Sequence, residues 1–361
     1  MIELLGLTLD QLRRQAVAWD LPAYCGNQLY HALYVERRWQ FDQMTNLSRT
    51  LRERLLREAS VTLPGIEKRY PSADGSVRYV LRLAPDTNAE ARKSPAERGR
   101  SSATTIETIW MPEADRQTLC LSSQAGCAVD CHFCATAQLG LIRNLTAGEI
   151  VGQVLTVLDA HRQELRPQTN VVLMGQGEPL LNYEETLQAV RLLADPEGMH
   201  IPLRKITLST SGIVPGIRRL AQEEIRPKLA VSLNATTDEQ RDAIMPLNRK
   251  YPLAPLLAAC RDYPLRPWER LTFEYVLLGG FNDTAADARR LVALIRGLRS
   301  KVNLIPWNSV PALPYRAPTD EAVETFQQIL REAGLLAFIR RSRGQDVFAA
   351  CGQLSLLEIT T

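Results

Sequence analysis

The chain has 361 residues, of which 45% are hydrophobic and 23% are charged, and these proportions are typical of a globular protein. No apolar run approaches the ~20 residues that a membrane span requires, and the first residues, MIELLGLTLDQLRRQ, lack the regions of a signal peptide. We therefore expect a cytoplasmic protein with no membrane association. The spacing of its seven cysteines favours metal binding or catalysis over structural disulfides, and Cys25 and Cys260 are expected to be packing residues.

Residues 1–60 have apolar positions at helical spacing. Thr8 and Ser48 are expected to be N-caps, and Leu51, Leu55 and Leu56 are expected to form one buried face. Residues 1–100 carry a net charge of +4, whereas the remainder carries −1. The sequence thus predicts a small helical domain at 1–60, with a weak indication that a polyanion binds the amino-terminal part.

Residues 61–115 change to a β pattern. The stretches SVRYVLRLA and TTIETIWMP alternate in polarity as the strands of a hairpin do. The polar segment between them, residues 86–103, is expected to be a mobile loop. We predict a β-hairpin extension here.

A repeating strand–helix pattern extends over residues 116–345. Strands are predicted at TLCLSS, NVVLM, KITLST, KLAVSLNA, LTFEYVLLG and KVNLIPW, with a last strand-like piece at LLAFIRRS. Helical patterns follow the strands, and Thr146 with Glu149 forms a capping box. The alternation predicts an α/β fold, a partial (β/α)6 barrel with its site at the carboxyl ends of the strands. Cys127 and the motifs GQGEP, STSG, SLNA and NSVP all lie at such ends.

The stretch CAVDCHFC places Cys127, Cys131 and Cys134 at the spacing C-x3-C-x2-C. A structural zinc site takes four ligands, and the nearest further candidates are Cys120 and His132. Three thiolates instead suit a [4Fe–4S] cluster with one iron left open, which can bind the amino and carboxylate groups of S-adenosylmethionine. This arrangement resembles the radical S-adenosylmethionine superfamily. Zinc binding is the alternative.

A narrower resemblance extends over nearly the whole chain. The ordered series FDQMTNLS, TLCLSSQAGCAVDCHFCATAQLG, GQGEPLLNY, KITLSTSGIVP, AVSLNATTDEQRDAIMP, NLIPWN and RGQDVFAACGQL is similar to the RlmN/Cfr family of radical RNA methyltransferases. The resemblance implies a radical barrel, one [4Fe–4S] cluster per chain, and two molecules of S-adenosylmethionine per turnover. It also implies a carboxyl-terminal tail, residues 346–361, that carries a methyl-accepting cysteine.

The family's mechanism assigns roles to two further cysteines. Cys351 accepts a methyl group from one S-adenosylmethionine, and a radical from a second molecule then takes a hydrogen from that methyl group. The carbon radical adds to an adenine base, and Cys120 removes a proton and attacks Cys351, which closes a transient disulfide and releases the RNA. Glu107 matches a proton acceptor of the family.

The resemblance also implies the remaining cofactor contacts. These residues are Gly177, Glu178, Ser209, Ser232, Leu233, Asn234 and Asn308. Four departures from the family pattern are Gln176 for a methionine, Asn234 for a histidine, and Gln345 and Phe348 in a run that is usually more acidic. Gln176 is expected to alter packing near the cofactor more than chemistry.

The family implies methylation at C2 of an adenosine in 23S rRNA, and in some members also of adenosine 37 in tRNA. Arg340, Arg341 and Arg343 could hold phosphates, and the domain at 1–60 is the expected RNA anchor. An electron donor such as flavodoxin and a monomeric state are also expected. Three alternatives stay open: methylation at C8, a radical enzyme on a protein or small substrate that needs neither Cys120 nor Cys351, and a zinc-stabilised RNA-binding module.

Overall fold

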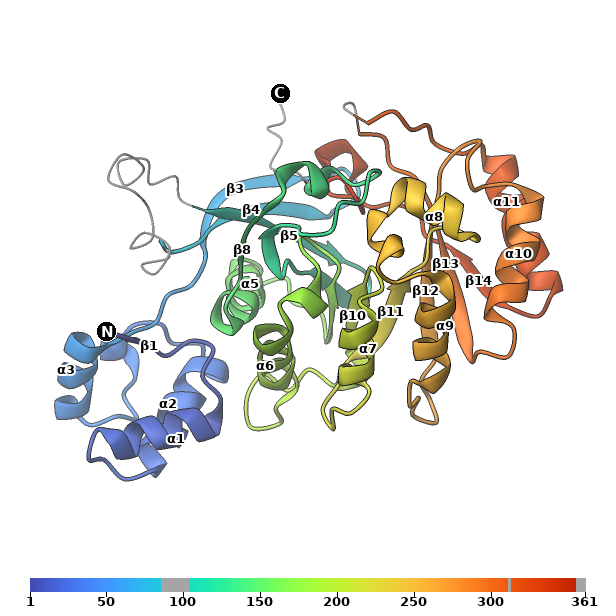
Figure 1. Cartoon of the computed structure of the whole chain (residues 1–361). Helices are drawn as coiled ribbons and strands as arrows, with labels where there is room; N and C mark the ends of the chain where they lie inside the picture. The colour runs from blue at the N-terminus through green and yellow to red at the C-terminus, as the bar shows by residue number, and fades with distance from the viewer. Residues whose placement is uncertain (86–103, 311–312, 355–361) are drawn as a thin grey trace, which may run out of the picture.

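A ten-stranded sheet forms the centre of the computed structural model, which describes residues 1–85, 104–310 and 313–354 (Figure 1). The order of its strands is β14-β13-β12-β11-β10-β9-β6-β5-β4-β3. In chain order they are β3 (Gly65–Pro71), β4 (Val77–Arg82), β5 (Thr105–Pro112), β6 (Arg116–Cys120), β9 (Gln168–Leu173), β10 (Ile206–Thr210), β11 (Lys228–Ser232), β12 (Leu271–Leu277), β13 (Ser300–Pro306) and β14 (Leu336–Ile339). The loop predicted at 86–103 and the end of the tail, 355–361, lie outside the described residues.

Within this sheet, the seven strands β6, β9, β10, β11, β12, β13 and β14 are all parallel. Helices connect them and stand along the outside of the sheet (Figure 1). They are α5 (Ala147–Ala160), α6 (Tyr183–Ala194), α7 (Val214–Leu220), α8 (Asp238–Ile244), α9 (Leu253–Asp262), α10 (Ala285–Ile295) and α11 (Asp320–Glu332). The predicted α/β partial barrel is confirmed, and β14 adds a parallel strand to the six predicted units.

The antiparallel strands β3, β4 and β5 continue the same sheet, because β5 pairs with β6. The predicted hairpin corresponds to β4 and β5. The edge strand β3 was not predicted: its sequence, GIEKRYP, is rich in charges, which is a common protection of a sheet edge and resembles a loop.

The predicted helix starts are confirmed at Thr8, Ser48 and Thr146, whose hydroxyls accept hydrogen bonds from backbone N–H groups of the first turn. Leu51 and Leu55 are buried, but Leu56 is 62% exposed, so the prediction that Leu56 belongs to the buried face is wrong. Because Leu56 directly follows Leu55, it is rotated by about 100° around the helix and points to solvent.

Three helices form the amino-terminal end of the molecule, next to α5 (Figure 1). They are α1 (Leu9–Ala18), α2 (Tyr24–Tyr34) and α3 (Arg49–Glu58), with the short parallel pair β1 (Ile2–Glu3) and β2 (Ala59–Ser60) beside them. Trp39 donates to Asp159 at 3.0 Å, and Tyr30 donates to Asp195 at 2.7 Å. These bonds join the helical end to α5 and to the loop after α6.

The cysteine-rich loop lies between two short antiparallel strands, β7 (Gln124–Gly126) and β8 (Leu141–Asn144). This hairpin follows β6, so the loop stands at the carboxyl edge of the parallel sheet. None of the helices in the described part of the chain has the length and apolar composition of a membrane span.

Candidate active site

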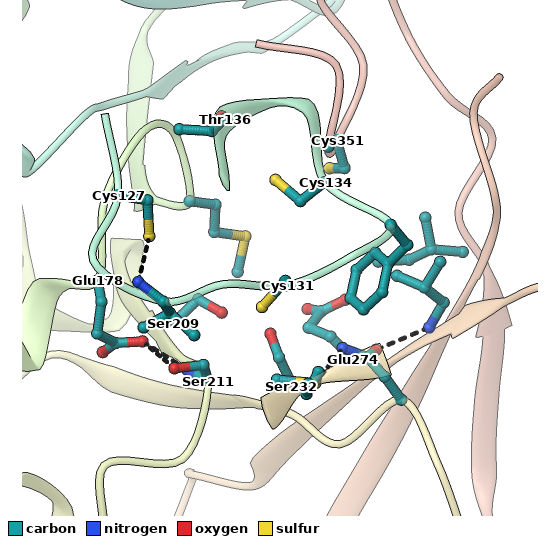
Figure 2. Close-up of a pocket in the computed structure, with 18 of the residues that line it drawn as sticks. Cys127, Cys131, Cys134, Thr136, Glu178, Ser209, Ser211, Ser232, Glu274 and Cys351 are labelled. Atoms are coloured by element: carbon teal, nitrogen blue, oxygen red, sulfur yellow. Dashed lines mark hydrogen bonds between the residues drawn. The ribbon is translucent and has the colours of Figure 1, made fainter. Parts of the chain in front are cut away.

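Cys127, Cys131 and Cys134 line one cavity at the carboxyl ends of the parallel strands, and Figure 2 shows their side chains around a common space. Backbone hydrogen bonds shape the loop that carries them. The Cys127 N–H donates to Gly140 O at 2.9 Å, and the Cys134 N–H donates to Cys131 O at 3.0 Å. The loop therefore presents three sulfurs to the same cavity.

The donor set fits an iron–sulfur cluster. Burial raises the pKa of all three thiols, that of Cys127 to about 12, and the proximity of the other thiols contributes to the rise for Cys127 and Cys131. Three neighbouring thiolates therefore need a bound cation to be stable. In the described part of the chain no three His, Cys, Asp or Glu side chains converge on a single metal ion. A cubane cluster is wider than one ion and separates its ligands accordingly.

The turn after β9 brings Gly177 and Glu178 into this cavity. Gly177 has φ +101°, and a Cβ there would lie 2.7 Å from the backbone N of Gln124, so only glycine fits. The Glu178 carboxylate accepts from the N–H and the hydroxyl of Ser211, each at 2.6 Å, and from Leu180 N–H at 3.1 Å (Figure 2). The Thr210 hydroxyl also hydrogen-bonds this carboxylate, so several donors fix its orientation in the cavity, where its charge can attract an ammonium group.

Ser209, Ser232 and Asn234 line the same cavity from the ends of β10 and β11, as expected. Asn234 has φ +58°, a left-handed conformation that asparagine tolerates better than most residues. Its Oδ1 accepts from Val276 N–H at 2.9 Å. Leu233 is fully buried and does not line this cavity.

Cys351 and Asn308 complete the cavity. Cys351 is a free cysteine, and Figure 2 shows it next to Cys134. The Asn308 side chain donates from Nδ2 to the backbone carbonyl of Cys351 at 3.0 Å. The carboxyl-terminal segment therefore returns to the barrel and places its thiol beside the cluster loop.

Cys120 lies at the end of β6 in a second cavity, which Cys351 and Cys134 also line. Burial raises the pKa of the Cys120 thiol to about 12, and the nearby Cys351 contributes to the rise. Burial also raises the pKa of Cys351, while the Arg340 guanidinium acts in the opposite direction. The two thiols predicted to form a transient disulfide thus share one cavity.

Glu107 does not line either cavity. It is fully buried on β5 and forms an ion pair with the buried Arg78, with 2.6 Å between Oε1 and Nη1. Gln176, one of the departures from the family pattern, donates from Nε2 to Glu107 Oε2 at 3.3 Å. The predicted proton acceptor thus lies behind the GQGE turn, and its catalytic role stays a prediction.

Several lining residues were not predicted as cofactor contacts. Ser211 holds Glu178, and the buried Glu274 lines the first cavity with its Oε1 accepting from Asn303 at 2.9 Å. Arg340 lines both cavities, whereas Arg341 and Arg343 line only the second. A single glutamate within the apolar strand LTFEYVL was the available signal for Glu274.

Comparison with known proteins agrees with this geometry. The model of the ribosomal RNA large subunit methyltransferase N-terminal domain matches residues 2–61, and that of the radical SAM superfamily matches residues 121–292. A probable dual-specificity RNA methyltransferase RlmN of Koribacter versatilis (strain Ellin345) is 48% identical, over 94% of this chain and 98% of the relative. The dual-specificity RNA methyltransferase RlmN of Anaeromyxobacter sp. (strain Fw109-5) is 46% identical, over 98% of this chain and 90% of the relative.

A solved structure shows the same architecture. The crystal structure of a radical SAM methyltransferase from Sphaerobacter thermophilus matches with a TM-score of 0.89 and 44% identity, over 98% of this chain and 99% of that one. Sequence and fold therefore agree along nearly the whole length. The chain belongs to the RlmN family of radical S-adenosylmethionine methyltransferases.

Proposed function

We propose that this protein methylates C2 of an adenosine in 23S rRNA, and of adenosine 37 in tRNA, through a methyl group carried on Cys351. One observation carries the proposal: Cys351 lines both the cavity that holds the three cluster cysteines and the cavity that holds Cys120. A thiol in this position can exchange groups with a ligand on one side and with a second thiol on the other.

The cluster site would be Cys127, Cys131 and Cys134, with Gly177, Glu178, Ser209, Ser232 and Asn308 around S-adenosylmethionine. When bound, the cluster and S-adenosylmethionine supply a methyl group and a 5′-deoxyadenosyl radical. Cys351 receives the methyl group on Sγ, loses a hydrogen atom from it, and bonds to the base through the resulting carbon. The radical adduct would give up one electron to the bound cluster and its ring proton to Cys120. After that proton passes to solvent, the Cys120 thiolate would attack Sγ of Cys351 and break the S–C bond; the released carbon would take up a proton and become the methyl group of the base, and a disulfide would remain. An electron donor such as flavodoxin would reduce this disulfide and the cluster.

An RNA substrate is supported by the names of the relatives, which are dual-specificity RNA methyltransferases. The adenine must leave its stack to reach Cys351, as for other enzymes that modify bases. Methylation at C8 is the alternative regiochemistry. A zinc-stabilised RNA-binding module is no longer supported, because the chain belongs to a family of radical enzymes.

The test is mass spectrometry of nucleosides from 23S rRNA fragments and tRNA incubated with cluster-loaded protein, S-adenosylmethionine and reductant. We expect 2-methyladenosine. Detection of 8-methyladenosine would show that the methylated position is C8 rather than C2. The absence of any methylated adenosine from both RNAs would refute the proposal.

Two variants test the roles of the thiols. Cys120→Ala is expected to form S-methylcysteine at Cys351 and to accumulate a covalent protein–RNA adduct, because release needs the second thiol. Cys351→Ala should form neither. Full RNA methylation by either variant would contradict the covalent route and favour a radical enzyme of another type.

A further inference from the structure

Asn308 connects the cofactor cavity to the loop that carries Cys351. Its side chain is 2% exposed and lines the first cavity. Nδ2 donates to the Cys351 carbonyl at 3.0 Å, while Oδ1 accepts from Ser342 Oγ at 2.5 Å and from Gln345 Nε2 at 2.8 Å. All three partners belong to the carboxyl-terminal segment, which is defined here as the residues that follow β14, 340–354.

The orientation of this amide follows from its partners. The Cys351 carbonyl is only an acceptor, so the atom of Asn308 that faces it must be the nitrogen. The oxygen then faces Ser342 and Gln345, which have donors to offer. Two acceptor positions and one donor of the amide are thereby used, and the second Nδ2–H is left for an acceptor atom of a ligand in the cavity.

The loop around Cys351 is also bound from the other side of the cavity. The Ala135 N–H donates to Gly352 O at 2.7 Å, and Thr136 Oγ1 donates to Leu354 O at 2.5 Å. Both donors directly follow the cluster ligand Cys134. The Asn308 bond holds the Cys351 carbonyl itself, one residue before the first of these two attachments.

We infer that Ser342 and Gln345 are positioning residues: they orient the Asn308 amide so that it holds the Cys351 backbone while one N–H faces the cofactor. The Asn308 side chain then sets the position of both the Cys351 backbone and the cofactor. The inference rests on the proposed function for the role of Cys351 as methyl acceptor. It goes further than the proposed function, because it assigns roles to Ser342 and Gln345, which are not among the expected S-adenosylmethionine contacts.

Gln345 is one of the positions at which the chain departs from the more acidic family run. An ionised Asp or Glu has no proton to donate and would place its charge against Asn308 Oδ1. The neutral amide therefore matches the orientation that the Cys351 carbonyl imposes. The presence of glutamine rather than an acidic residue at position 345 is therefore consistent with this hydrogen-bond network.

The test compares Ser342→Ala, Gln345→Glu and the double variant with the wild type and with Ser342→Thr, which keeps the hydroxyl. Three quantities are measured: the dissociation constant of S-adenosylmethionine, the single-turnover rate of Cys351 methylation at saturating S-adenosylmethionine, and amide hydrogen exchange of residues 349–353 in the full chain.

The double variant is expected to methylate Cys351 at least about fivefold more slowly, as the loss of hydrogen bonds worth about 1 kcal/mol each implies. Its exchange at residues 349–353 should be faster, and its dissociation constant for S-adenosylmethionine should rise, because the Asn308 amide no longer has a fixed orientation toward the cofactor. Ser342→Thr should behave as the wild type in all three measurements.

Wild-type methylation rate and wild-type exchange in the double variant would overturn the inference. A weakened dissociation constant with an unchanged saturated rate would also overturn it, since Asn308 would then act only on the ligand. If the wild type itself never methylates Cys351, the proposed function fails, whereas the exchange comparison still decides whether Ser342 and Gln345 order the loop.

Discussion

Arg78 and Glu107 form a charged pair inside the sheet. Both side chains are fully buried, they join β4 to β5, and the Arg78 guanidinium also lies 4.4 Å from the centre of the Tyr70 ring. The Glu107 carboxylate receives a further hydrogen bond from Gln176. Such a pair is costly to desolvate, so its two members depend on each other.

Removal of one partner should therefore destabilise the fold more than removal of both. Glu107→Leu or Arg78→Met alone is expected to lower the free energy of unfolding by about 3–5 kcal/mol, because each removes the ion pair and keeps the other charge buried away from water. The double variant should recover most of this loss. Urea unfolding of the four proteins measures the coupling, and additive single losses would contradict it.

The same double variant addresses the predicted catalytic role of Glu107. If Glu107 is the proton acceptor, the folded double variant should lose RNA methylation while it still methylates Cys351. Retained RNA methylation would show that Glu107 is not the proton acceptor.

His161 provides a pH-dependent contact. Its Nε2 is hydrogen-bonded to the Tyr79 hydroxyl at 2.6 Å, and its ring stacks on Trp110 with 3.5 Å between centroids. Burial lowers the pKa of His161, Glu164 acts in the opposite direction, and Arg69 lowers it further. The folded protein therefore prefers the neutral imidazole.

Because the unfolded chain binds this proton more readily, stability should fall as the pH drops through about 6.5, the ordinary pKa of histidine. We expect the wild type to lose more unfolding free energy between pH of about 7.5 and about 5.5 than His161→Gln, whose amide can accept from Tyr79 but does not titrate. Parallel pH profiles of the two proteins would contradict this assignment.

At the scale of elements, the sequence predicted the strands and helices that have a local periodic pattern. The parallel strands alternate with amphipathic helices, and Thr8, Ser48 and Thr146 mark helix starts by their own side-chain chemistry. The edge strand β3 was missed because both its faces carry polar residues. The three cysteines could be proposed as cluster ligands because they share one loop, whereas the Asn308–Cys351 contact joins residues 43 positions apart and has no local pattern.

The docking of the amino-terminal end onto α5 depends on two glycines in close contact. A Cβ on Gly148 would lie 2.4 Å from the backbone oxygen of Leu5, and a Cβ on Gly6 would lie 2.4 Å from the backbone nitrogen of Gly148. These are backbone atoms, so neither side can move away without shifting an element.

Gly148→Ala is therefore expected to lower the free energy of unfolding by about 1–3 kcal/mol, the usual cost of overpacking. Limited proteolysis should cleave first between the helical end and the barrel. Gly65→Ala is the matched control, since a Cβ there would meet only Arg82 O at 4.0 Å. Equal stability of the two variants would show that the contact can relax.

At the scale of the whole molecule, the carboxyl-terminal segment crosses to the opposite side of the barrel from the strand that precedes it. It leaves β14 at one end of the sheet and contacts the turn between β3 and β4 at the other, where Gly344 N–H donates to Asp74 at 2.9 Å and Ser72 donates to Asp346 at 2.6 Å. This crossing places Cys351 over the open side of the barrel, between the cluster loop and Cys120. The antiparallel strands thus support the site rather than only extend the sheet.

The helical end of the molecule lies far from α10 and α11 (Figure 1), and residues 1–60 carry eight Arg against seven Asp and Glu, a net charge of +1. Arg14 and Arg57 are both exposed there. If this end anchors RNA, the double charge reversal Arg14→Glu, Arg57→Glu should weaken RNA binding. It should also reduce the dependence of log K on log salt by about 0.7–0.9 for each phosphate that the protein no longer neutralises. The rate of Cys351 methylation without RNA should not change, because the reversed charges lie outside the barrel.

The matched control is the double reversal Arg289→Glu, Arg296→Glu, which changes two exposed arginines at the end of the molecule with α10. It alters the net charge by the same amount, so it measures the non-specific electrostatic effect on RNA binding. Titration of tRNA at several salt concentrations compares the two variants. An equal loss of affinity in both would assign the effect to net charge and would argue against the helical end as the RNA anchor.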